Sequence, residues 1–285
     1  MIAHLGVARS SWGRTVPTAA DPTPAPAYAS CGPVAAPPGA VRCVWRHRVA
    51  PQPTDPPLVV PDACMDMIWD GRDLWVADPD TGPMHERLRP GSLLVGLRFQ
   101  PGVGPAVLGV PGSELRDRRV PLVDLWGPTA RDLAEHLAAG AGVGQLTGIL
   151  ENAVRSRLLN GAVPDPEVSG LVRRLADEAG HGPVSDLADD LGLSERQLLR
   201  RSQAALGYGP ATFVRILRFQ RLMVIGRHRS TWSLGRLALA VGYADQAHMG
   251  REVRRLSGLT PRNLRAGWMS DPYKTQGEST GMMAS

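Results

Sequence analysis

Two clusters of polar side chains, about fifty residues apart, have the chemistry needed to recognise the edges of base pairs. The first holds Arg196 and Arg200, and the second holds Gln246, His248 and Arg251. The planar guanidinium of arginine can donate two parallel hydrogen bonds to O6 and N7 of guanine, and the amide of glutamine matches N6 and N7 of adenine. Nearby side chains are candidates for contacts to the phosphate backbone, which takes most hydrogen bonds in protein–DNA complexes: Ser194, Arg201, Arg215, Arg218 and Arg255. Arg215 and Arg218 could instead support the fold, and Arg201 and Arg255 could be solvated surface charges. His248 could equally cap its helix or contact a phosphate.

The same order of elements surrounds both clusters. In residues 185–201 a short apolar segment ends at Gly192, and Ser194 with Gln197 then forms a capping box that fixes the start of a basic helix. In residues 233–252 Gly242 takes the turn position and Asp245 is the expected N-cap. A short apolar helix, a glycine turn and a capped basic helix form the helix-turn-helix pattern, so the chain is expected to carry two DNA-recognition helices.

A third helix is expected to connect the two units. Residues 213–225 follow Pro210 and keep a helical apolar spacing without a break. Thr260 and Pro261 then mark the start of a final helix. Because successive major grooves on one face of DNA lie about 34 Å apart, two rigidly linked units could occupy neighbouring grooves.

The positive charge of the chain is concentrated on this segment. The whole chain has a formal net charge of +5. Residues 166–268 hold 16 arginines against 9 acidic residues, a balance of +7, whereas residues 1–165 have a balance of −1. The favoured partner of the C-terminal segment is therefore a polyanion such as double-stranded DNA.

Composition divides the rest of the chain into further regions. Residues 1–40 are rich in alanine and proline and are expected to be a disordered arm, as is the polar tail over 269–285. Residues 41–163 begin with short apolar runs between turn residues and end with two helical segments, 127–139 and 144–159. The predicted fold class is therefore α+β: a small β-rich domain with following helices, then an all-α domain over 167–268.

No catalytic or metal site is expected. Cys31, Cys43 and Cys64 lack the C-x-x-C spacing and paired histidines of a zinc site, so reduced thiols without a metal or other cofactor are predicted. Asp62 and Asp66 could act as an acid–base or metal-binding pair, but no histidine cluster, nucleophile elbow or phosphate loop accompanies them. The simpler interpretation is that Asp62 organises a turn. The protein is thus predicted not to be an enzyme.

The role of the tryptophans stays open at this level. The tryptophans at positions 45, 69, 75 and 126 could fill the core of the β-rich domain or line an apolar pocket.

No apolar run approaches the roughly 18 residues of a membrane span, and the start of the chain lacks the pattern of a secretory signal. The expected location is cytoplasmic and nucleoid-associated, with no membrane partner.

The segment from about Glu167 to Trp268 resembles the DNA-binding domain of AraC/XylS-type transcription regulators. The motifs that carry the resemblance are Ser194-x-Arg196-x-Leu198-x-Arg200-Arg201, Gly207-Tyr208-Gly209-Pro210, Gly242-Tyr243, Asp245-Gln246-Ala247-His248 and Gly258-Leu259-Thr260-Pro261. The resemblance implies a sequence-specific regulator that reads two successive major grooves, with RNA polymerase as a further partner. Departures from the family pattern are Ser202 and Val253, where aromatic residues are usual, and Leu199, where a polar residue is common.

The two recognition helices are not equivalent in this sequence. Ala247 and Gly250 are too small to hydrogen-bond a base edge, so the second helix has fewer groups for direct readout. Arg196 and Arg200 stand at a helix start with a clear capping box. We expect the first helix to contribute more base discrimination and the second more positioning.

Segments 61–69, 96–102 and 121–127 resemble a poorly characterised β-rich domain found fused to AraC-type DNA-binding domains. This resemblance implies no known ligand, so a small-molecule effector and a homodimer interface on the helices over 127–159 both stay open. The competing functions are an enzyme, such as a DNA-repair protein, targeted to DNA by its C-terminal domain, and a non-specific nucleoid protein. The alkyl-transfer repair enzymes need a cysteine cluster that this chain lacks.

Overall fold

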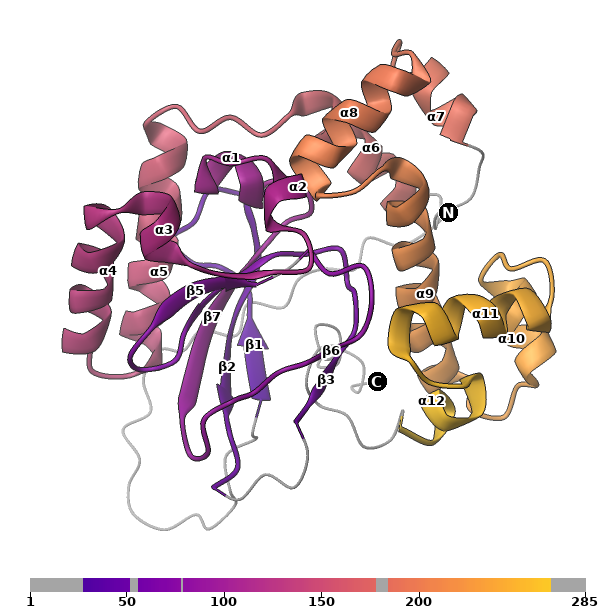
Figure 1. Cartoon of the computed structure of the whole chain (residues 1–285), viewed down its shortest axis with the longest axis horizontal. Helices are drawn as coiled ribbons and strands as arrows, with labels where there is room; N and C mark the ends of the chain where they lie inside the picture. Colours follow the sequence, from indigo (N-terminus) through magenta and orange to yellow (C-terminus); the bar gives the residue numbers. More distant parts are fainter. Residues whose placement is uncertain (1–27, 52–55, 78, 178–183, 268–285) are drawn as a thin grey trace, which may run out of the picture.

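The computed structural model describes residues 28–51, 56–77, 79–177 and 184–267, and its N-terminal half is built on an antiparallel β-sheet (Figure 1). The sheet has six strands in the order β1-β2-β7-β4-β5-β8. Their bounds are β1 Tyr28–Cys31, β2 Val41–Arg48, β4 Asp66–Trp69, β5 Leu74–Ala77, β7 Leu93–Phe99 and β8 Arg119–Pro121. Strands β3 (Leu58–Val59) and β6 (Met84–His85) form a separate antiparallel pair. The predicted β-rich domain is confirmed.

One face of the sheet is covered by helices. A row of apolar side chains crosses four strands through the pairs Val44 with Leu97, Leu97 with Met67, and Met67 with Val76. These residues join one core with side chains from α1 (Gly104–Leu108), α3 (Leu122–Trp126), α4 (Pro128–Ala139) and α5 (Val143–Leu159). Helices α4 and α5 match the two helical segments expected from the sequence. Short helix α2 (Gly112–Leu115) follows α1 at the upper rim of the sheet (Figure 1).

The opposite face of the sheet carries the neighbouring row of side chains. Trp45, Gly96, Ile68 and Trp75 are paired in that order across β2, β7, β4 and β5. A Cβ atom added to Gly96 would lie 2.2 Å from the Trp45 indole, so the ring packs directly over the glycine backbone. A larger residue at position 96 would displace this tryptophan.

Residues 28–40 correct one sequence prediction. They were expected to belong to a disordered arm, but Tyr28–Cys31 pair with Val44–His47 of β2. The carboxylate of Glu151, itself only 1% exposed, accepts hydrogen bonds from the backbone N–H groups of Val34, Ala35 and Ala36. Backbone pairing and a buried acceptor therefore order a segment whose composition suggested disorder. The rest of the expected arm, 1–27, and the tail from 268 lie outside the described residues.

The C-terminal half is helical. Its elements are α6 (Pro166–Asp177), α7 (Val184–Asp190), α8 (Glu195–Leu206), α9 (Pro210–His228), α10 (Leu234–Ala240), α11 (Gln246–Ser257) and α12 (Pro261–Gly267). They share one apolar core centred on α9, with Phe213, Ile216 and Phe219 fully buried. Val60 and Ala63 of the N-terminal half also belong to this core. Among the described helices, none combines the length and apolar character required to cross a membrane.

Candidate nucleic-acid interface

The first helix-turn-helix unit consists of α7 and α8. Gly192 has a φ of +65° in the turn between them, a conformation that favours glycine. The capping box is present as predicted: the N–H of Gln197 donates to Ser194 Oγ at 3.3 Å, and the N–H of Ser194 donates to Gln197 Oε1 at 2.9 Å. These two hydrogen bonds fix the first turn of α8, and with it the direction of the side chains that follow.

Arg196 and Arg200 lie on the solvent side of α8. Both side chains are exposed and one helical turn apart, whereas Leu198, Ser202 and Ala205 point into the core. Leu199, which stands where a polar residue is common, is 44% exposed. The exposed surface near the start of α8 therefore offers two guanidinium groups next to an apolar side chain.

Arg201 is engaged within the protein. Its Nη1 lies 2.8 Å from Asp165 Oδ2 and 3.0 Å from Glu167 Oε2, at the start of α6. Burial alone would raise the pKa of Asp165, but hydrogen bonds from the Val168 N–H and from Arg201 lower it below its ordinary value. The hydrogen bond and charge of Asp165 likewise raise the pKa of Arg201. This arginine holds α8 against α6, which is a structural role that the sequence pattern did not reveal.

The second unit, α10 and α11, repeats the arrangement with different groups. Asp245 caps α11 by accepting the N–H of His248 at 2.6 Å, and this hydrogen bond is the main cause of the lowered pKa of Asp245. Gln246 and Arg251 are exposed near the start of the helix. His248 is half-buried: its Nδ1 accepts the N–H of Ala244 at 3.4 Å, and its ring packs edge-on against Tyr243 at 5.3 Å between centroids. That hydrogen bond assigns the ring proton to Nε2.

Two arginines that are candidates for contacts to the phosphate backbone of DNA also hold α9 against the second unit. Arg215 lies 3.9 Å from the carboxylate of Glu252 on α11, and it donates to Thr212 Oγ1 at 3.0 Å. The guanidinium of Arg218 lies over the ring of Tyr243 at 5.6 Å. Both side chains are half-buried, whereas Arg255 and Ser194 are exposed. Arg215 and Arg218 therefore fix the position of α11 on the spacer helix.

Residues 79–83 of the N-terminal half lie against the C-terminal ends of α8 and α11. Gly207 caps α8 with a φ of +87°, and an added Cβ there would lie 2.3 Å from Pro79 Cγ. Gly258 caps α11 with a φ of +71°, and its Cβ would lie 3.7 Å from Pro83 Cγ. We call residues 79–83 the bridging loop. Nothing local in the sequence indicates these contacts, because their partners lie more than a hundred residues away.

Two acidic residues tie the bridging loop to strand β8 and its neighbourhood. Asp80 is 3% exposed and accepts two hydrogen bonds from Arg119, at 3.0 and 2.9 Å, while Glu86 binds the same guanidinium. The N–H of Thr81 donates to Asp117 Oδ1 at 2.6 Å. The position of the loop is therefore coupled to Arg119.

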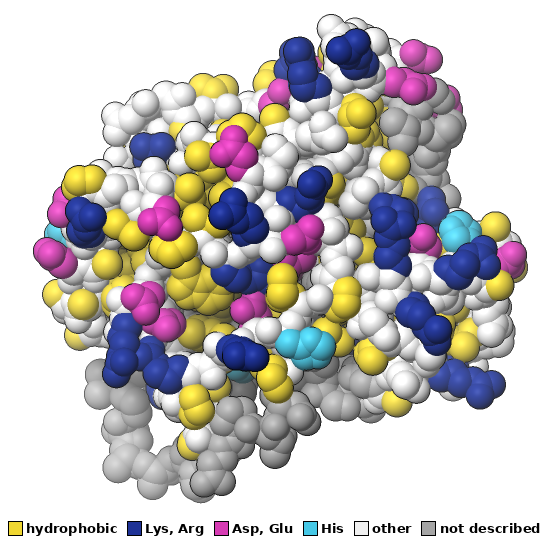
Figure 2. All heavy atoms as spheres, viewed as in Figure 1, with side chains coloured by type: hydrophobic (Ala, Val, Ile, Leu, Met, Phe, Trp, Pro, Cys, Tyr) yellow, Lys and Arg dark blue, Asp and Glu magenta, His cyan; other side chains and the backbone are white. Residues whose placement is uncertain are grey.

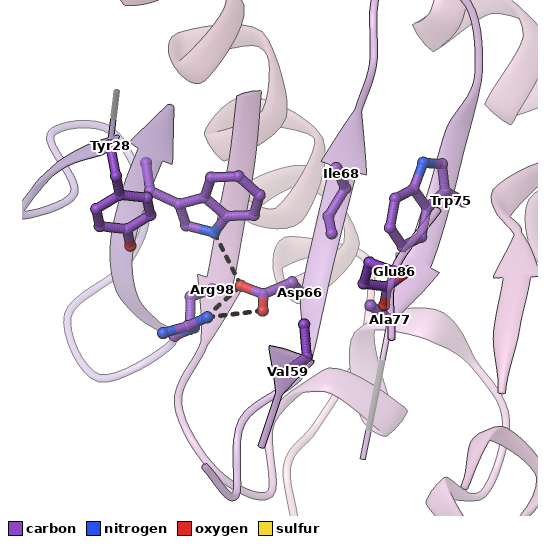
Figure 3. A pocket seen from close by; sticks show the side chains of 9 residues that line it. Tyr28, Val59, Asp66, Ile68, Trp75, Ala77, Glu86 and Arg98 are labelled. Carbon is purple, nitrogen blue, oxygen red and sulfur yellow. Dashed lines mark hydrogen bonds and ion pairs between the residues drawn. The ribbon is translucent and has the colours of Figure 1, made fainter. Parts of the chain in front are cut away.

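The open face of the sheet holds a small, mainly apolar pocket (Figure 3). Trp45 and Trp75 line it, whereas Trp69 and Trp126 belong to the core under the helices, so the tryptophans divide between the two alternatives. Asp66 at the pocket wall accepts hydrogen bonds from Trp45 Nε1 at 2.9 Å and from Arg98 at 3.0 and 2.9 Å.

The acidic pair of the sequence analysis has a structural role at this wall. Arg98 also pairs with Asp62 at 3.2 Å, and Asp62 accepts the N–H of Cys64, as expected for a turn-organising residue. Although burial opposes it, the two carboxylates raise the pKa of Arg98. Burial also raises the pKa of the Cys64 thiol to about 12. Within the described ranges, no three His, Cys, Asp or Glu side chains are grouped to hold a metal ion.

Two capped helix-turn-helix units on one spacer helix define a DNA-binding domain. Comparison with known families agrees: residues 187–267 match a family described as a helix-turn-helix domain, and residues 38–121 match a domain of unknown function (DUF6597). The chain therefore carries an AraC-type helix-turn-helix domain behind an N-terminal domain of unknown function. This domain content is that of a DNA-binding transcription regulator.

Solved structures give a more distant comparison. The crystal structure of ToxT from Vibrio cholerae O395 is 8% identical, with a TM-score of 0.43 over 79% of this chain and 97% of that chain. A structure of ToxT from V. cholerae strain SCE256 with bound unsaturated fatty acid is 8% identical, with a TM-score of 0.37 over 78% and 93%. No curated protein matches the chain.

Proposed function

We propose that the protein is a sequence-specific transcription regulator that places α8 and α11 in two successive major grooves of double-stranded DNA. The observation that carries the proposal is the arrangement of the two units about α9. This helix has 19 residues and is therefore about 28 Å long, comparable to the groove repeat of about 34 Å. Figure 1 shows α8 at the upper end of α9 and α10–α12 about its lower half.

The proposed base-reading groups are Arg196 and Arg200 in the first groove and Gln246, His248 and Arg251 in the second. Arg196 and Arg200 are exposed and face the same side of a capped helix, which supports a direct role in readout. Nδ1 of His248 accepts the N–H of Ala244, so only Nε2–H of this ring is available to DNA. We therefore propose that α8 contributes more to discrimination and α11 more to positioning.

The proposed phosphate contacts fall into two groups. Ser194 and Arg255 are exposed near the recognition helices and can reach the backbone of DNA directly. Arg201, Arg215 and Arg218 have partners within the protein, so their main contribution is to hold α8 and α11 in place. Loss of these three side chains would weaken binding to all DNA sequences alike.

We assign the regions 41–163 and 167–268 to a regulatory domain and a DNA-binding domain, respectively. The regulatory domain senses a signal or mediates assembly, and RNA polymerase and a second copy of the chain are the proposed protein partners. The bridging loop supports the assignment of a regulatory role to the β-sheet domain, because it brings this domain into contact with the ends of α8 and α11.

Genome-wide mapping of the sites bound by the full-length protein in its own cells tests this function. It should return a motif with two half-sites about one helical turn apart.

Fluorescence anisotropy on that motif then tests which side chains read the bases. Arg200→Ala should weaken binding by about 1–3 kcal/mol and relax one base preference. Arg155→Ala, at an exposed position of α5, is the matched control and should leave binding unchanged. Equal affinity for the motif and random DNA across salt concentrations would refute sequence-specific regulation.

A further inference from the structure

A groove runs along the β8 edge of the sheet, between β5, β8 and the helices α3 and α4. Its volume is about 500 Å³, within the usual range for small-molecule sites. In Figure 2 apolar side chains floor a hollow in this region, with basic and acidic side chains at its rim. The lining residues are Arg72, Asp73, Leu74, Trp75, Arg119, Pro121, Val123, Ala130, Arg131 and Ala134.

The charges of this groove favour an anion. Arg72 and Arg131 are exposed, and within the described residues neither guanidinium has an ion-pair or hydrogen-bond partner. Arg119 lies deeper, where it is paired with two carboxylates, Asp80 and Glu86, and is therefore not counted toward the charge of the rim. Asp73 is the carboxylate among the lining residues. Two unpaired arginines against one acid give the rim a net positive charge, and the planar guanidinium suits a carboxylate or a similar oxyanion.

The floor of the groove favours an apolar body on that anion. Trp75 is half-buried and offers an aromatic surface, and Leu74, Val123 and Ala134 add aliphatic surface. An inorganic ion would leave this apolar surface exposed to water, whereas an organic acid with a ring or chain would cover it.

We propose that this groove binds a small organic anion, with its acidic group at Arg72 and Arg131 and its apolar body against Trp75. The site also lies next to Arg119, which holds Asp80 of the bridging loop. An anion that binds the Arg119 guanidinium competes with Asp80 for it. If Asp80 is released, the bridging loop can move, and its contacts with the C-terminal ends of α8 and α11 change. The regulatory part of the proposal rests on the proposed DNA-binding function, but ligand binding itself does not.

The fluorescent dye 1-anilinonaphthalene-8-sulfonate, an aromatic anion, is a suitable probe for the full-length protein. It should bind with increased fluorescence and be displaced by 4-phenylbutyrate more strongly than by 4-phenylbutylamine, which has the same apolar body and the opposite charge. The double variant Arg72→Gln/Arg131→Gln should lose affinity about tenfold, since a hydrogen bond to a charged group is worth about that factor.

Two further variants keep this test independent of charge and of folding. Ala134→Phe fills the groove from α4 without a change of charge, and it should weaken the dye to a similar extent. Arg155→Gln removes an exposed arginine from α5, which does not line the groove, and should leave the affinity unchanged. Circular dichroism melting of each variant confirms that it is folded.

Three results would overturn the proposal: unchanged dye affinity in the double variant, unchanged affinity in Ala134→Phe, or equal displacement by the amine and the acid. A dimer that dissociates on Ala134→Phe would assign the groove to a second copy of the chain instead. Because the dye is measured without DNA, loss of this site leaves the DNA-binding function standing. Conversely, a protein that binds the dye but no specific DNA would refute only the proposed function.

Discussion

The contact between Gly207 and the bridging loop can be tested by a single methyl group. In Gly207→Ala the new Cβ has two costs. The left-handed backbone at φ +87° costs a non-glycine residue about 1–2 kcal/mol. The Cβ would also lie 2.3 Å from Pro79 Cγ and 3.0 Å from the carbonyl oxygen of Gly112, so the bridging loop and α2 must shift. Forced shifts of this kind cost about 1–3 kcal/mol. The expected loss in free energy of unfolding is therefore about 2–5 kcal/mol.

Gly192→Ala is the matched control. Gly192 lies in the turn after the first helix of the same unit with a φ of +65°, but no atom of the described residues lies within 4 Å of its added Cβ. It should lose only the backbone contribution of about 1–2 kcal/mol. Urea denaturation of both full-length variants, followed by tryptophan fluorescence, measures the difference. Equal losses in the two variants would show that the loop does not press on the end of α8, and the argument for coupling through this contact would fail.

Three other measurements follow from individual side chains. Among the residues that the structure describes, the buried hydroxyl of Ser202 has no hydrogen-bond partner, so Ser202→Ala should raise the free energy of unfolding by about 1 kcal/mol in urea denaturation; a loss of stability would reveal a partner for this hydroxyl. The lowered pKa of Asp165 means that its contribution to stability is present above its ordinary pKa of 3.8 and is lost as the pH falls through the lower folded value. Asp165→Asn should therefore show a weaker loss of melting temperature below about pH 4, and an unchanged pH profile would contradict this role. Glu151→Gln should cost about 1–3 kcal/mol and speed amide hydrogen exchange at Val34 and Ala36, because a charged acceptor is replaced by a neutral one; unchanged exchange would show that β-pairing alone orders the segment.

The sequence alone was sufficient to predict the features that depend on residues close to one another in the chain. The Ser194–Gln197 box, the Asp245 cap and the turn glycines each depend on residues within a few positions, and all are present in the structure. The two helices over 127–159 were also predicted, because apolar periodicity is a property of the segment itself.

The sequence failed where the decisive partner is remote. The N–H groups of residues 34–36 are bound by Glu151, which is more than a hundred positions away, so composition alone misassigned this segment. The pairing of Arg201 with Asp165 was hidden for the same reason, and the contact of Arg201 with DNA stays a prediction. The groove at β8 depends on how α4 lies against the sheet, which no short motif encodes.

The bridging loop also bears on which DNA sites the protein can distinguish. Since Pro79 and Pro83 lie at the ends of α8 and α11, a displacement of one helix relative to the other changes the contact with the loop. Along DNA, a relative shift of about 3.4 Å corresponds to one base pair between half-sites. In the proposed mode of DNA binding, a loop held firmly by Arg119 would therefore favour one half-site spacing, whereas a released loop would tolerate several. The N-terminal half would in this way select among promoters by the length of the spacer between half-sites, with no change in the bases that either helix reads.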